Sequence, residues 1–230
     1  MSPELIALCF ALVFLCAGLA ALFLRAVYRK SFVEALILKG TASACFIALG
    51  AITAFSGELS TTSMLVFIGL CLGIIGDEII ALCQVLPKHD TLTFIGGGSF
   101  FLVGHVLYIV ALFMLGDISW LALIAAFLVA TTVSAAYTRR KGSLSPKMKT
   151  TLTLYLAAVA FMAATAIGAF FGRFTLGAGL FAAGGLLFAA SDNILFAYKY
   201  GEKPRFIQNI LLHVFYYAAQ ILIAWSIAFI

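Results

Sequence analysis

Two aspartates stand inside long apolar runs of this sequence. Asp77 occurs in the string GDEII, and Asp192 occurs in the similar string SDNIL. An Asp near the middle of a membrane-spanning helix costs about 2.5 to 3.5 kcal/mol on insertion scales. With Glu78 and the similarly placed Lys39, the total is on the order of 10 kcal/mol, which rivals the net stability of a domain. Groups this costly indicate an enclosed polar site, in which desolvation and repulsion tend to leave one carboxyl group protonated and the other ionised.

A second shared pattern follows each aspartate. The string HVLY runs from His105 to Tyr108, and HVFY runs from His213 to Tyr216. The repeated order is consistent with two four-helix halves related by an axis along the membrane normal, although a chance match of such short strings gives the same pattern.

The last apolar segment carries a polar stripe. Asn209, His213, Tyr216, Tyr217 and Gln220 fall at i, i+4, i+7, i+8 and i+11, which is one face of a helix. In lipid such a stripe must point into the bundle. The stripe therefore belongs with the enclosed site.

The elements that position these residues are membrane spans. The 230 residues are 64% hydrophobic and 10% charged, whereas soluble domains average about 25% charged residues. Apolar stretches of about 20 residues predict an all-α, eight-transmembrane-helix bundle in a single domain covering residues 1–230. The expected spans are near 4–27, 33–55, 63–86, 92–115, 118–138, 150–170, 175–198 and 206–229.

The basic residues indicate the orientation. Of the fourteen Lys and Arg residues, twelve fall in the first, third, fifth and seventh loops, here called the odd loops. Of the other two, Lys39 lies within a span and Arg173 in an even loop. The positive-inside rule places the odd loops in the cytoplasm and both termini outside it. The one-sided distribution argues against a nucleic-acid patch, and the short loops favour a bacterial inner membrane over a eukaryotic internal membrane.

Measured from the cytoplasmic helix ends, the polar residues form one layer about 9 to 21 Å deep at 1.5 Å per residue. Taken one at a time, several of these residues also have a purely structural interpretation. Lys39 could extend to the interface, and His105 and His213 could be neutral hydrogen-bonding groups between helices. Glu78 points about 100° away from Asp77 and could pair with a neighbouring span.

Taken in order, the motifs resemble the YhhN family, whose eukaryotic members are lysoplasmalogenases. The resemblance covers nearly the whole chain and rests on four strings: Gly76-Asp77 with Ile80, Gly104-His105-x-x-Tyr108, Ser191-Asp192-x-x-Leu195 and Tyr216-Tyr217-x-Ala219-Gln220. The chain departs from the family at Gly40, where Pro is frequent, and at Ile80, where Leu is frequent. Neither departure removes a proposed catalytic group.

The resemblance implies hydrolysis of the vinyl ether bond of a lysoplasmalogen-type lysophospholipid, without a cofactor or metal. Protonation of the β-carbon gives an oxocarbenium ion, which water captures as a hemiacetal that collapses to a fatty aldehyde and a glycerophospho head group. Asp77 and Asp192 would supply acid and carboxylate, in an order that the sequence leaves open. Lys39 would bind the phosphate. The remaining polar groups would orient water, carboxylates and substrate; they are His105, Tyr108, His213, Tyr216, Tyr217 and Gln220.

Two other classes of function fit the same residues. Two His and two Asp could form the zinc site of a metal-dependent lipid hydrolase, although the sequence lacks HExxH or other tight ligand spacing. Paired intramembrane acids also suit a proton-coupled transporter. All four prolines lie in loops or at span ends, which gives no sign of the broken helices that many transporters use.

Overall fold

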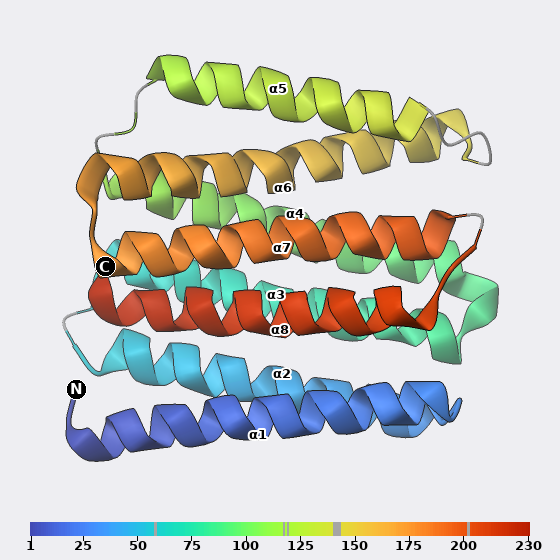
Figure 1. Ribbon diagram of the computed structural model, residues 1–230, viewed down its shortest axis with the longest axis horizontal. Helices are drawn as coiled ribbons and strands as arrows, with labels where there is room; N and C mark the ends of the chain where they lie inside the picture. The colour runs from blue at the N-terminus through green and yellow to red at the C-terminus, as the bar shows by residue number, and fades with distance from the viewer. Residues whose placement is uncertain (58, 117, 119, 140–143, 202) are drawn as a thin grey trace.

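The computed structural model describes the chain except for residues 58, 117, 119, 140–143 and 202, and it is a bundle of long helices (Figure 1). The all-α expectation is confirmed, since no strand occurs within the described part of the chain. Two short 3-10 helices, Pro87–His89 and Ile227–Phe229, accompany the α helices. The α helices are α1 (Pro3–Tyr28), α2 (Phe32–Phe55), α3 (Thr61–Val85), α4 (Asp90–Met114), α5 (Trp120–Arg139), α6 (Pro146–Arg173), α7 (Leu176–Tyr200) and α8 (Phe206–Ser226).

Seven of these helices are long and apolar enough to cross a membrane, judged by length and composition over the described residues. The eighth, α5, contributes a shorter apolar stretch, Ala126–Ala136, to that search. The chain is thus a multi-pass membrane protein, and a span at α5 stays a prediction.

The largest difference from the expected spans is in α6. This helix begins at Pro146 rather than near 150, and it ends at Arg173 rather than near 170. The side chain of Ser145 caps the first turn by accepting a hydrogen bond from the backbone N–H of Met148, with proline in the first position. The added first turn is basic and polar, so a scan for apolar residues does not detect it.

The helices pack as two similar groups of four. In each group, consecutive helices are in contact, and the groups meet where α2 packs on α8 and α4 packs on α6. The two contacts are equivalent: if four is added to each helix number, and counting restarts after α8, the α4–α6 contact becomes the α8–α2 contact. α1 and α5 lie at opposite edges of the bundle (Figure 1). One departure is that α1 also contacts α8, whereas no contact joins α5 and α4 in the described structure. This arrangement suits the predicted duplication, which itself stays a prediction.

Glycines bring α3 and α4 into backbone contact. A methyl group added at Gly97 would lie 2.5 Å from the carbonyl oxygen of Gly76, and one added at Gly104 would lie 3.2 Å from that of Gly69. Such small residues let membrane helices approach closely. The contact fixes the helix that carries Asp77 against α4.

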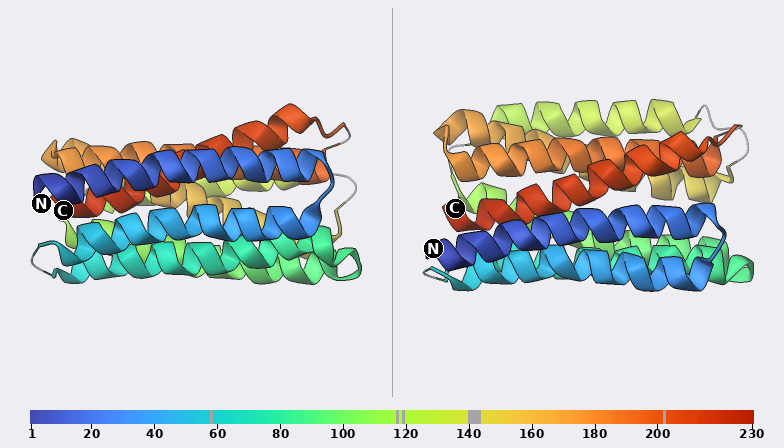
Figure 2. Two further views of the ribbon diagram at one scale, coloured as in Figure 1. Left: turned by 90° about the horizontal axis from the view of Figure 1, so that it is seen from below. Right: turned by 60° about the horizontal axis from the view of Figure 1, so that its bottom comes forward.

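The two termini lie at one end of the bundle, and the odd loops lie at the other (Figures 1 and 2). An even number of antiparallel helices returns the chain to the end at which it started. Those basic residues of the odd loops that the structure describes therefore gather at a single end, although which side of the membrane this end faces stays a prediction.

Candidate functional site

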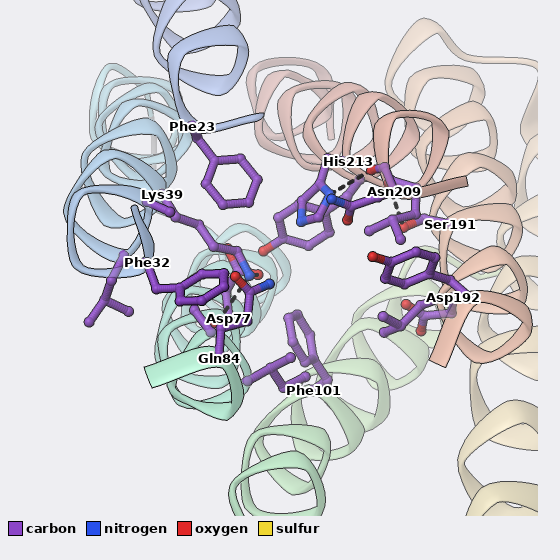
Figure 3. Close-up of a pocket in the computed structure, with 18 residues that line it drawn as sticks. Phe23, Phe32, Lys39, Asp77, Gln84, Phe101, Ser191, Asp192, Asn209 and His213 are labelled. Carbon is purple, nitrogen blue, oxygen red and sulfur yellow. Dashed lines mark hydrogen bonds and ion pairs between the residues drawn. The ribbon is translucent and has the colours of Figure 1, made fainter. Parts of the chain in front are cut away.

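A cavity of about 100 Å³ lies inside the bundle, nearer the odd-loop end. Helices α1, α2, α3, α4, α7 and α8 line it, and Figure 3 shows Asp77 and Asp192 on opposite sides of it. Five of the nine residues proposed from the sequence line this cavity: Lys39, Asp77, Asp192, His213 and Tyr216. The two motifs, distant in sequence, therefore contribute to one space.

Asp77 is held by a cation and a hydroxyl group from α2. The Lys39 Nζ atom lies 2.7 Å from Oδ1 of Asp77, and the Ser43 hydroxyl donates to Oδ2 at 2.9 Å. Lys39 also donates to the backbone carbonyl of Asp77 at 3.2 Å. Both charged side chains are buried. The structure thus places Lys39 in an enclosed ion pair.

Asp192 has a neutral partner. The hydroxyl group of Tyr155, on α6, donates to Oδ2 of Asp192 at 2.8 Å. Asp192 is as buried as Asp77, with 5% of its surface exposed in each case. Within the described part of the chain, no Lys, Arg or His forms an ion pair with Asp192. The neighbouring Ser191 donates to the carbonyl of Leu212, which ties α7 to α8 at this level.

His213 presents one ring nitrogen as an acceptor. Its Nδ1 atom lies 2.8 Å from the carbonyl oxygen of Asn209. Because a carbonyl can only accept, this nitrogen carries the hydrogen, and neutral imidazole then has its lone pair on Nε2. The Phe23 ring packs edge-on against His213, with centroids 4.7 Å apart.

Two of the remaining sequence-proposed residues support the cavity from α8. The Gln220 amide donates to the hydroxyl group of Tyr216 at 3.1 Å, and the Tyr217 hydroxyl group donates to the carbonyl of Lys39 at 3.4 Å. Neither Gln220 nor Tyr217 lines the cavity. Gln220 therefore holds Tyr216 within α8, and Tyr217 connects α8 to Lys39 on α2.

His105 and Tyr108 lie on α4, away from the cavity lining. Both His105 nitrogens and the Tyr108 hydroxyl oxygen are buried without a hydrogen-bond partner among the described residues. The His105 ring instead packs edge-on against Phe188 at 4.8 Å and against Tyr155 at 5.9 Å. It therefore contacts the tyrosine that holds Asp192, but it has no direct place in the cavity.

Ser43 and Tyr155 are not among the residues proposed from the sequence. Ser43 lies four residues after Lys39 on the same helix face, so its contact with Asp77 could have been inferred from that spacing. Tyr155 is a single tyrosine in an apolar helix, and only the packing of α6 against α7 brings it to Asp192.

Glu78 faces α2 rather than the cavity. A methyl group added at Gly40 would lie 3.2 Å from its carboxyl carbon. Gly40 therefore leaves the space that Glu78 occupies, and Glu78 Oε1 has no hydrogen-bond partner among the described residues.

The four residues considered for a zinc site do not form one. No group of three or more His, Cys, Asp or Glu side chains with metal-binding geometry is found in the described part of the chain. His105, one of the four, is enclosed by aromatic rings.

Comparison with known proteins identifies a family. A family model described as the YhhN family matches residues 35–227, which include every residue of the cavity lining except Phe23 and Phe32. Comparisons with curated proteins and with solved structures gave no match.

Proposed function

Because this chain belongs to the YhhN family, we propose that it is a membrane-embedded hydrolase that cleaves the vinyl ether bond of lysoplasmalogen-type lysolipids. The products are a fatty aldehyde and a glycerophospho head group. The observation that carries the proposal is the unequal pair of aspartates in one cavity. Asp77 contacts a lysine, and Asp192 contacts a tyrosine. No metal or cofactor is part of the proposal.

We assign the acid role to Asp192. An enclosed carboxyl group without a cation avoids the cost of a buried, uncompensated charge by keeping its proton. The Tyr155 hydroxyl group occupies Oδ2, which leaves the proton on Oδ1. Transfer of that proton to the β-carbon of the vinyl ether breaks the carbon–carbon π bond and places positive charge on the oxygen and the α-carbon.

Asp77 is assigned the carboxylate role. Its charge is balanced by Lys39, so it is an anion before the substrate binds. A fixed carboxylate across the cavity stabilises the oxocarbenium ion as it forms. This is the division of work between two carboxyl groups that glycosidases use.

Lys39 then has two roles. An ammonium group has three N–H donors, and the carboxylate and carbonyl of Asp77 accept two of them. Its first role is therefore to balance the charge of Asp77, and the third donor is available to the substrate phosphate. The head group would lie in a wider recess of about 520 Å³ that shares Phe32, Gln84 and Tyr198 with the cavity lining.

Water attack completes the reaction. The Nε2 atom of neutral His213 can accept a hydrogen from the attacking water. Addition of this water at the α-carbon gives a hemiacetal. Collapse of the hemiacetal breaks the bond to the glycerol oxygen, which takes the proton held by His213 and leaves as the free alcohol, while the hemiacetal hydroxyl group returns a proton to Asp192. One water is consumed for each aldehyde released.

The test uses purified protein and a panel of lysolipids, with mass spectrometry of the released products. Alkenyl ether lysolipids should yield aldehyde. The matching saturated alkyl ethers should yield none, because they lack the carbon–carbon double bond that the acid protonates. A chelator should not change the rate. Aldehyde release from neither class, together with proton-driven uptake of a solute into proteoliposomes, would contradict the proposal and support a transporter.

The proposed orientation has both termini outside the cytoplasm, in a bacterial inner membrane. It is supported by the gathering of the odd loops at one end of the bundle (Figure 1). Reporters that are active only in the cytoplasm should be silent when fused to either terminus and active in the third loop. The opposite pattern would reverse the orientation.

A further inference from the structure

An apolar groove runs along the side of the bundle between α1 and α8. These two helices lie beside each other in Figure 2 (right). The groove has a volume of about 310 Å³. The α1 side is lined largely by small residues, Ala17, Ala20 and Ala21, and the α8 side includes Tyr217 and Ile221. Ala17 and Ala21 are exposed, so the groove opens on the lipid-facing surface.

The groove adjoins the aspartate cavity at His213. This side chain lines both spaces. Phe23, which lines the cavity only, packs edge-on against the His213 ring. The two rings therefore form the partition between the groove and the cavity.

The direction of the groove follows from its α1 residues. The lining runs from Leu24, near the level of the cavity, to Val13, near the middle of the helix. At 1.5 Å per residue this is a length of about 16 Å. The hydrocarbon core of a bilayer is about 30 Å thick, so the groove extends through roughly one leaflet.

We propose that this groove binds the hydrocarbon tail of the lysolipid substrate. The inference rests on the proposed function and extends it by naming the binding site of the tail. With its tail along α1, the head group lies in the recess at the odd-loop end and the ether bond lies beside His213. This is the orientation that a lipid already has in the leaflet next to the odd loops. The substrate can therefore enter sideways, without leaving the membrane.

A second apolar recess competes for the tail. It lies among α3, α4, α6 and α7 and includes Gly98, Leu102 and Tyr155. Its volume is about 60 Å³, about a fifth of that of the groove. The groove between α1 and α8 has the length that a long hydrocarbon tail needs, so we assign the tail to the groove.

The first test substitutes small residues of α1 by phenylalanine. Ala17→Phe and Ala21→Phe narrow the groove. Gly18→Phe is the matched control, because no atom lies within 4 Å of a methyl group added there. The ratio of kcat/KM for long-tailed over short-tailed alkenyl lysolipids should fall about tenfold in both groove variants, which is about 1.4 kcal/mol of lost tail binding. In the control this ratio should stay within about twofold of the wild-type value. An equal ratio in the groove variants and the control would overturn the proposal.

The second test does not depend on hydrolysis. A saturated alkyl ether lysolipid with a diazirine at the end of its tail is irradiated with the wild-type protein in vesicles. Crosslinks should fall on residues 13–24 of α1 and 213–221 of α8. If they do so while no alkenyl lysolipid is cleaved, the tail site stands and the proposed function fails. Crosslinks at residues 94–102 of α4, or evenly over all lipid-facing helices, would overturn the tail site alone.

Discussion

The two halves of the bundle hold their aspartates in the same way but with different partners. In the first half, Asp77 of α3 is held by Lys39 of α2, which lies 38 positions earlier. In the second half, Asp192 of α7 is held by Tyr155 of α6, which lies 37 positions earlier. The scaffold thus places a carboxyl group at the same point of each half. Replacing a cation by a phenol gives one group a fixed charge and leaves the other able to carry a proton.

The fourth helices of the two halves differ in a related way. His213 of α8 lines the cavity, whereas His105 of α4 is enclosed by the rings of Phe188 and Tyr155. The repeated HVxY string therefore has two uses. In α8 it contributes a ring to the site, and in α4 it packs behind the tyrosine that holds Asp192.

The largest effects are expected from the aspartates themselves. Asp77→Asn and Asp192→Asn should each reduce turnover at least about a hundredfold, the usual scale for the loss of electrostatic stabilisation in the first case and of a general acid in the second. Their effects on stability should differ. Asp77→Asn leaves Lys39 buried without its anion and should cost about 3 to 5 kcal/mol. Asp192→Asn keeps an acceptor for Tyr155 and should cost about 1 kcal/mol or less.

Turnover and urea unfolding in detergent measure the two quantities. Equal losses of stability in the two variants would contradict the assignment of Asp77 as the charged carboxylate and Asp192 as the protonated acid. Full activity in both variants would remove the aspartates from the reaction.

A large effect is also expected from the lysine. Lys39→Met leaves Asp77 as a buried, uncompensated carboxyl group, so it should destabilise the protein by about 3 to 5 kcal/mol and reduce kcat. The double variant Lys39→Met with Asp77→Asn should recover most of that stability, because neither charge remains. A destabilisation equal to the sum of the single effects would show that the two side chains act independently. An increase in KM alone, at unchanged kcat, would give Lys39 a role in head-group binding only.

A smaller effect is expected from the tyrosine. Tyr155→Phe removes the only hydrogen bond to the Asp192 carboxyl group found among the described residues. Turnover should fall about tenfold at an unchanged KM, because the acid is less well positioned rather than lost. Tyr200→Phe is the control, since Tyr200 lies on the neighbouring α7 but lines neither the cavity nor the head-group recess. An unchanged kcat in Tyr155→Phe would show that the position of Asp192 does not depend on this contact.

The smallest effect is expected from a glycine of α4 that has room for a side chain. Gly98→Ala adds a methyl group with no atom within 4 Å of it, and replacement of glycine within a helix favours the helix by up to about 1 kcal/mol. In contrast, Gly97→Ala would bring a methyl group within 2.5 Å of the carbonyl oxygen of Gly76 and should destabilise the protein by about 1 to 3 kcal/mol. Unfolding of the two variants measures the difference, and a neutral Gly97→Ala would contradict the close approach of α3 and α4.

The sequence predicts most of this fold because apolar length and polar spacing are local properties. Seven spans agree closely with the described helices, and the two aspartates line one cavity, which the depth estimate allowed. The contacts that distinguish the two aspartates were not predictable in this way. Tyr155 reaches Asp192 only through the rotation of α6 about its axis, and α6 begins in a polar turn that hydropathy does not detect. The groove beside α1 likewise depends on which faces of two distant helices meet.

The measurement that tests the central claim most directly is hydrolysis of an alkenyl lysolipid in heavy water. The released aldehyde is reduced at once to its alcohol, so that later exchange does not add label, and its mass is recorded. Protonation of the vinyl carbon by a solvent-exchanged carboxylic acid predicts one deuterium on the carbon next to the former aldehyde group. An aldehyde released without that deuterium would contradict the proposed chemistry.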